Sequence, residues 1–317
     1  MRFMVQSDNR RSYFNLITIV IFFFGVFFWI SDLLYVKNHY GFNYEEIYIY
    51  FFGDFEYPEP ISAVSLLEDI HIYMFLYFMF NILFLPLFIR ILPSERLGIF
   101  YSLLIFASSF TSLISDLLTY YINPSFIYLR IFSYFIYKIS SLIALITLGL
   151  LPFVRKTNIY ISAINVVVVL FALGSIFFLS INFWMFLLKM GFSPESIFYY
   201  YNGNPEQFIK GKSLEGLLTI FTAHVLAGAV FIFVMGHFFI FCKFSYKKHL
   251  FVIISISMFV EFIGGFLIKT GIMLFSYLKV VAFIFMEISL IFMAFYIIKD
   301  IIKGKLVWTY RRSLQEQ

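Results

Sequence analysis

The chain has 317 residues, of which 62% are hydrophobic and 13% are charged, with a formal net charge of +5 and a mean hydropathy of +0.91. Soluble domains contain about 45–50% apolar and about 25% charged residues, so this composition excludes a soluble globular protein. The single cysteine, Cys242, excludes a disulfide or a thiol redox pair within the chain.

Apolar stretches of about 20 residues, the length that crosses the hydrocarbon core of a bilayer, occur eight times. The first is too long for a signal-peptide core and has no small-residue cleavage site, so we expect it to be retained. Backbone groups must be paired in lipid and no alternating pattern indicates a barrel, so the spans are predicted to be helices. The expected spans are 14–35, 66–89, 98–121, 126–153, 160–188, 215–241, 249–271 and 275–298.

Three sequence blocks recur in the same order at almost the same offset, which indicates a tandem duplication. Gly41–Ile47 recurs as Gly191–Ile197 at an offset of 150, Ser62–Leu67 as Ser213–Leu218 at 151, and Phe126–Arg130 as Phe275–Lys279 at 149. The predicted organisation is a first four-helix repeat (1–156), a second four-helix repeat (157–298) and a basic cytoplasmic tail (299–317).

The duplication predicts an all-α polytopic membrane protein built from two parallel repeats. Because each copy has four spans, an even number, both copies insert in the same orientation. We therefore expect a pseudo-twofold axis along the membrane normal, with a rotation of about 180° between the copies.

Lysine and arginine orient the predicted bundle. Most of the 23 such residues lie in the N-terminal segment, in the loops after even-numbered spans and in the tail: Arg2, Arg10, Arg11, Arg90, Arg96, Arg155, Lys156, Lys243, Lys247, Lys248, Lys299, Lys303, Lys305, Arg311 and Arg312. By the positive-inside rule, both termini are expected on the cytoplasmic side of a bacterial inner membrane. The positive charge is thus a topology signal, and the expected partners are the lipid bilayer and other membrane subunits, with no nucleic acid.

The two long loops, after the first and fifth spans, are each predicted to begin with a short helix, at 43–51 and 193–201. In the second copy, Ser193 is a candidate N-cap and Pro194 takes the first helical position. The first of these loops is rich in Asp and Glu, which favours a solvated outer surface, with a docking face for a cation or a partner as the alternative.

Ionisable residues inside a span are costly and are therefore candidate functional residues. The most informative of these residues are Lys138, Glu261 and Glu287. At the offset of 149, Lys138 is equivalent to Glu287, so opposite charges occupy equivalent depths in the two copies. We predict a salt bridge between them across the interface of the repeats, which fixes how the halves dock. The alternatives are a local partner for each charge and a proton relay.

Near the outer ends of their spans, Arg130 and Lys279 are also equivalent. Asp116 is the expected partner of Arg130. The equivalent of Asp116 in the second copy is Gly265, so Lys279 is expected to lack such a partner and to reach interfacial water. These charges are interpreted as interfacial anchors, with anion binding as the alternative.

Histidines in the spans raise the question of a b-type haem. His224 and His237 lie 13 residues apart in the sixth span, but their equivalents in the second span are Tyr73 and Pro86. The second span offers only His71, which lies about 200° around the helix from Tyr73. We therefore expect isolated polar histidines and no cofactor, and keep haem binding by His71, His224 and His237 as an alternative.

The sequence resembles an uncharacterised bacterial family of four-helix membrane proteins with a Gly-Phe/Tyr-Ser-Pro-Glu stretch followed by Lys-Ser-x-x-Gly-Leu-Leu-Glu-x-x-His-x-His. The second half matches through Gly191–Glu195 and Lys212–Leu218 and then keeps His224, while the first half keeps Leu66–Glu68 and His71. The resemblance covers most of each half and implies a tandemly duplicated membrane bundle. The family's histidine pair would imply a metal or haem site, but the motif is divided between the two halves here.

Three functions are compatible with these features, and the sequence has no phosphate loop, zinc-binding His-Glu-x-x-His or nucleophile elbow. The first, which we favour, is a non-catalytic structural or accessory subunit, or scaffold, of a membrane complex. The second is a b-type haem or metal-binding electron-transfer subunit. The third is a small-solute or proton-coupled transporter with its polar centre at Lys138, Glu261 and Glu287.

Overall fold

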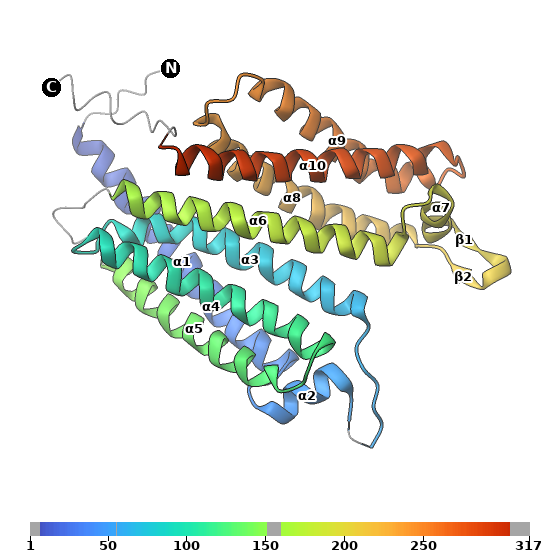
Figure 1. Ribbon diagram of the computed structural model, residues 1–317, viewed down its shortest axis with the longest axis horizontal. Helices are drawn as coiled ribbons and strands as arrows, with labels where there is room; N and C mark the ends of the chain where they lie inside the picture. The colour runs from blue at the N-terminus through green and yellow to red at the C-terminus, as the bar shows by residue number, and fades with distance from the viewer. Residues whose placement is uncertain (1–6, 55, 151–159, 305–317) are drawn as a thin grey trace. The chain divides into compact units, whose positions relative to one another are not determined.

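A computed structural model describes residues 7–54, 56–150 and 160–304 (Figure 1). This part of the chain contains eight helices that are long and apolar enough to cross a membrane, which confirms the predicted number of spans. The end of the expected fourth span, at 151–153, and most of the expected tail, at 305–317, lie outside the described residues. The chain divides into two compact units, residues 1–174 and 175–317.

Unit 1 contains five complete helices and the beginning of a sixth. They are α1 (Ser7–His39), α2 (Tyr44–Phe52), α3 (Ala63–Ile89), α4 (Glu95–Tyr121), α5 (Phe126–Gly149) and the first part of α6 (Ile161–Met190). Helices α4 and α5 share the most extensive contact, and α3 packs on α4. Buried serines along α4, such as Ser102, Ser109 and Ser115, donate to carbonyls of their own helix and let neighbouring backbones approach closely.

Unit 2 repeats this order of elements. It contains the rest of α6, then α7 (Pro194–Asn202), β1 (Gly203–Asn204), the 3₁₀ turn η2 (Pro205–Gln207), β2 (Ile209–Lys210), α8 (Leu214–Ile240), α9 (Lys247–Ile268) and α10 (Leu274–Ile302). Helices α9 and α10 share its most extensive contact, as their counterparts α4 and α5 do in unit 1. Strands β1 and β2 form a short antiparallel hairpin in which Gly203 pairs with Lys210.

The division between the units falls inside α6, because the first part of this helix packs on α3 and α4. A Cβ atom on Gly174 would lie 2.5 Å from the Phe78 ring, and one on Gly98 would lie 3.2 Å from Ala163. These glycines therefore let α6 approach the preceding helices. The repeat boundaries at 156 and 298 concern sequence homology rather than packing, and they stay a prediction.

Helices α2 and α7 confirm the two short loop helices predicted at 43–51 and 193–201, since each end differs by one residue. Ser193 accepts a hydrogen bond from the backbone N–H of Ser196 at 3.0 Å, with Pro194 at the first helical position. In the first copy Asn43 takes the cap, since its side chain accepts from Glu46 N at 2.8 Å. The Glu46 carboxylate bonds back to the N–H groups of Phe42 and Asn43 and completes a capping box.

Equivalent glycines on either side of these helices adopt the same backbone conformation. Gly41 and Gly191 precede them with φ of +83° and +68°, and Gly53 and Gly203 end them with φ of +82° and +88°. Residues other than glycine rarely adopt a positive φ. The duplication is therefore visible in local backbone structure as well as in sequence.

We expect Asn43→Ala to weaken α2 by about 1 kcal/mol, because the first turn loses its side-chain acceptor. Amide hydrogen exchange in residues 44–52 should become faster, with little change in residues 194–202. Ser193→Ala is the reciprocal control and should accelerate exchange in α7 only. Equal acceleration of both helices by either variant would contradict this assignment.

Candidate functional site

A buried ion pair joins α1 to α5 in unit 1. The Lys138 ammonium lies 3.0 Å from the Asp32 carboxylate, and both side chains are only 3% exposed. Lys138 also donates to the carbonyl of Trp29 at 2.7 Å and lies 4.5 Å from the centre of its indole ring. Both charges are thus neutralised within this unit.

The same contact recurs in unit 2 with different chemistry. Asn182 on α6 donates to the carboxylate of Glu287 on α10 at 2.5 Å. Asn182 is equivalent to Asp32 at an offset of 150, and Glu287 is equivalent to Lys138 at 149. One copy therefore uses an ion pair and the other an amide–carboxyl hydrogen bond.

The predicted ion pair between Lys138 and Glu287 is corrected by these contacts, because each residue has a partner within its own unit. The structure supports the local alternative, and the ion pair of Lys138 is assigned to Asp32. The physical reason is proximity: an acid on the helix packed against α5 lies within reach of the ammonium. Asp32 is not among the residues predicted from the sequence, although an Asp inside the first apolar stretch is the signal that indicates such a partner.

A second buried ion pair joins α4 to α5. Arg130 Nε lies 2.5 Å from Asp116 Oδ1, as the sequence predicts, and the guanidinium lies 4.3 Å from the centre of the Tyr40 ring. The cavity beside this pair measures about 10 Å³, whereas small-molecule sites measure about 300–1,000 Å³. This part of unit 1 is therefore a packed polar core.

Lys279, the equivalent of Arg130, also has a partner, which corrects the expectation that it reaches interfacial water. Its ammonium lies 2.5 Å from the Glu261 carboxylate and donates to the Glu261 carbonyl at 2.7 Å. Glu261 precedes Gly265, the equivalent of Asp116, by four residues, so the acid has moved by one helical turn and remains on the same face. Gly264 lets the helices approach, since its Cβ would lie 3.1 Å from the Lys279 side chain.

Tyrosines connect the two ion pairs of unit 1. Tyr77 donates to Asp32 at 3.2 Å and Tyr134 at 3.4 Å, and both also line the small cavity beside Arg130. Their equivalents in unit 2 are Gly228 and Phe283, which have no hydroxyl. The ion-pair positions are thus polar in both units, whereas the tyrosine connection belongs to the first.

The polar groups of unit 1 continue towards α2. Tyr50 donates to the Asp69 carboxylate, and His39 Nε2 lies 3.6 Å from the same carboxylate. Burial raises the pKa of Tyr50, and its hydrogen bond to Asp69 raises the pKa further, so this phenol stays protonated and acts as the donor. Burial also raises the pKa of Tyr40, whose ring packs against Tyr50.

The histidines considered for haem are not brought together as a ligand pair within either unit. His71 lies on α3 in unit 1, and His224 and His237 lie on exposed positions of α8 in unit 2, about 20 Å apart by helix rise. His224 Nδ1 lies 2.9 Å from the carbonyl of Ile220 on its own helix. Within the described ranges, no group of three His, Cys, Asp or Glu side chains is placed to hold a metal ion.

The polar pairs can have two roles, one structural and one in proton exchange. A buried pair fixes the axial position of one helix against another, since sliding would leave a charge or an amide unpaired. In unit 1, Asp32 also accepts hydrogen bonds from the phenols of Tyr77 and Tyr134, a local cluster within which protons can be exchanged.

Comparison with known proteins identifies the family. No curated protein and no solved structure matches the chain. The family model described as a transmembrane helical domain matches twice, over residues 41–159 and 191–307, so each match covers most of one sequence repeat. The chain is therefore a multi-pass membrane protein of the Aq_1264_TM family.

Proposed function

We propose that the chain is a non-catalytic membrane subunit that acts as a scaffold for other membrane proteins. The observation that supports it most is the equivalent polar pairing in the two units: α5 is tied to α1 and α4, and α10 is tied to α6 and α9. These pairs use the intramembrane charges to fix helices within a bundle. Two bundles in one chain would replace a dimer of single-repeat proteins, with both termini on the cytoplasmic side, as the distribution of Lys and Arg favours.

Purification from native membranes in a mild detergent tests the scaffold role. We expect a complex with stoichiometric companion proteins and a reduced-minus-oxidised spectrum without a b-haem band. A chain that purifies only as a single copy without companions would contradict the proposal. A stoichiometric b-haem that is lost in His224→Ala would replace the scaffold with the electron-transfer alternative.

The tyrosine connection in unit 1 favours proton transfer as a second candidate function. Protein reconstituted in liposomes, with an internal pH dye and a potassium diffusion potential, distinguishes the two functions. A scaffold gives no proton flux above protein-free liposomes. Proton transfer predicts a flux that falls in Tyr77→Phe and Tyr134→Phe, which lack the hydroxyls on Asp32, but not in Tyr128→Phe, an exposed tyrosine of the same helix as Tyr134.

A further inference from the structure

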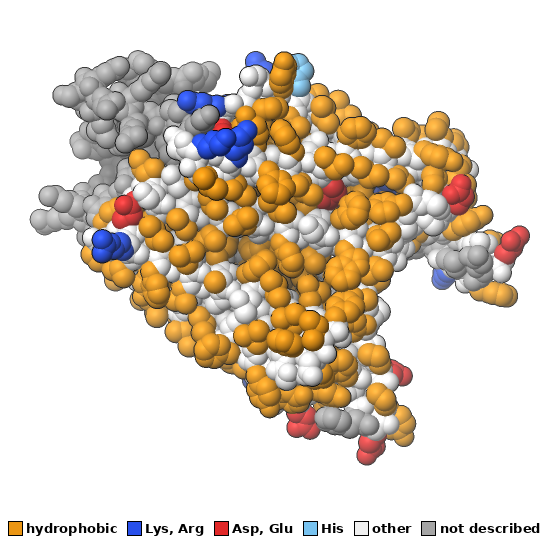
Figure 2. Space-filling view, viewed as in Figure 1, with side chains coloured by type: hydrophobic (Ala, Val, Ile, Leu, Met, Phe, Trp, Pro, Cys, Tyr) orange, Lys and Arg blue, Asp and Glu red, His pale blue; other side chains and the backbone are white. Residues whose placement is uncertain are grey.

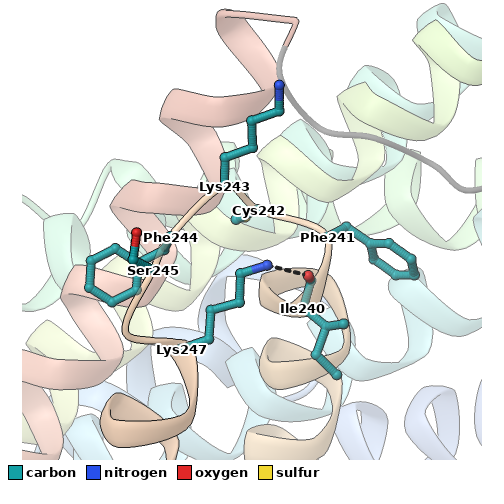
Figure 3. Close-up of a pocket in the computed structure, with 7 residues that line it drawn as sticks. All are labelled: Ile240, Phe241, Cys242, Lys243, Phe244, Ser245 and Lys247. Atoms are coloured by element: carbon teal, nitrogen blue, oxygen red, sulfur yellow. Dashed lines mark hydrogen bonds between the residues drawn. The ribbon is translucent and has the colours of Figure 1, made fainter.

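A hollow of about 550 Å³ lies beside the six-residue loop that joins α8 and α9 (Figure 3). Because both helices cross the membrane, so short a connection places the hollow at the membrane–water interface, at the level of lipid headgroups. Its lining comes from the loop and the adjoining helix ends: Ile240, Phe241, Cys242, Lys243, Phe244, Ser245 and Lys247.

The charge at this hollow is positive. Figure 3 shows Lys247 turned inward, where its ammonium donates to the Ile240 carbonyl at 2.6 Å, and Lys243 extended outward from the loop. The nearby acid, Asp300 on α10, is 2% exposed and accepts the Lys243 backbone N–H at 2.6 Å, so its carboxylate is directed to the loop backbone. Lysine side chains gather at this end of unit 2 (Figure 2).

The rest of the lining is apolar or neutral. Ile240 is 64% exposed and Phe241 and Phe244 are half-buried, so hydrocarbon surface adjoins the two lysines. Burial raises the pKa of the Cys242 thiol to about 12, so this group carries no negative charge at neutral pH. A cationic rim beside an apolar wall is suited to an amphiphilic anion.

The corresponding loop of unit 1 differs. Residues 90–94, between α3 and α4, contain Arg90, and α4 then begins with Glu95 and Arg96. The Glu95 carboxylate accepts the backbone N–H of Ser162 at 3.0 Å, so an acid stands beside the two basic residues of this loop. The second helix of the corresponding pair in unit 2 begins instead with Lys247 and Lys248, so the lysine pair belongs to the second copy.

We propose that this hollow binds the phosphate group of an anionic phospholipid, with Lys243 and Lys247 contacting the phosphate and Ile240 and Phe241 contacting the start of the acyl chains. Basic pockets beside transmembrane helices recognise anionic headgroups by this combination of charge and apolar contact. The site does not depend on the proposed scaffold function, since it uses only residues of α8, α9 and their loop.

Thermal unfolding of the full chain in neutral detergent micelles tests the site with three probes: short-chain phosphatidylglycerol, short-chain phosphatidylcholine and inorganic phosphate. We expect phosphatidylglycerol to raise the unfolding temperature with saturation and the other two probes to have little effect. Equal stabilisation by phosphatidylcholine, or by inorganic phosphate at the same concentration, would overturn the assignment to an anionic lipid.

Matched variants separate binding from folding. Each lysine near an anionic headgroup raises the binding constant about fivefold. The double variant Lys243→Gln with Lys247→Gln should therefore weaken phosphatidylglycerol binding about 30-fold. Lys248→Gln removes the same charge from outside the lining and should bind as the unaltered protein does. Since Lys247 also bonds the end of α8, Lys243→Gln alone should weaken binding about fivefold, and Lys243→Arg should retain it. Unchanged binding in the double variant would overturn the proposal.

Discussion

Replacing Lys138 with methionine is expected to destabilise the protein by about 3–5 kcal/mol, because Asp32 would remain buried without a cation. The loss should appear as a lower free energy of unfolding in mixed micelles of neutral detergent and sodium dodecyl sulfate. Asp32→Asn should have a similar effect, since it leaves Lys138 buried without an anion. The double variant should lose much less free energy of unfolding than the sum of the losses in the two single variants.

The second copy supplies the matched control. Glu287→Gln should cost less than about 1 kcal/mol, because Asn182 and a glutamine amide can still form a hydrogen bond. The effects of Lys138→Met and Glu287→Met should add, since each residue has its own partner within its own unit. A strong coupling between these two changes would instead support the ion pair across the repeats and contradict the local assignment.

The sequence was sufficient to predict the framework of the fold. Spacing of apolar stretches predicted eight spans, and recurrence of the Gly-Phe block predicted two short helices that the structure contains at Tyr44–Phe52 and Pro194–Asn202. Both depend on local composition and on caps, which are properties of contiguous residues. The Arg130–Asp116 pair was also predictable, because its members lie on consecutive helices joined by a short turn.

The partners of Lys138 and Lys279 were not predictable by the same reasoning. Repeat symmetry gives the depth of a charged residue, but it does not say which neighbouring helix faces it. Asp32 comes from α1, more than 100 residues before Lys138, and only tertiary packing shows that it faces α5. Glu261 is grouped with Lys138 and Glu287 in the sequence-based prediction, because the offset of the repeat compares position with position, whereas the acid that pairs with Lys279 has moved by one turn.

That one-turn shift leads to the second large expected effect. Asp116→Ala should destabilise the protein by about 3–5 kcal/mol, since Arg130 is left buried and unpaired. Ser112 is equivalent to Glu261 at the offset of 149 and lines the small cavity beside Arg130. Adding Ser112→Glu to Asp116→Ala would therefore reproduce in unit 1 the arrangement that unit 2 uses.

We expect this added acid to recover more than about 1 kcal/mol of the loss, the remainder being offset by the cost of a larger side chain in a packed core. The measurement is again the free energy of unfolding in mixed micelles. Ser112→Gln in the Asp116→Ala background has the same size without the charge and should recover little. Ser112→Glu alone should destabilise the protein, because two carboxylates would then share one guanidinium. If glutamine restored stability as well as glutamate does, filling of space rather than a shifted counter-ion would explain the rescue, and the equivalence of the two ion pairs would fail.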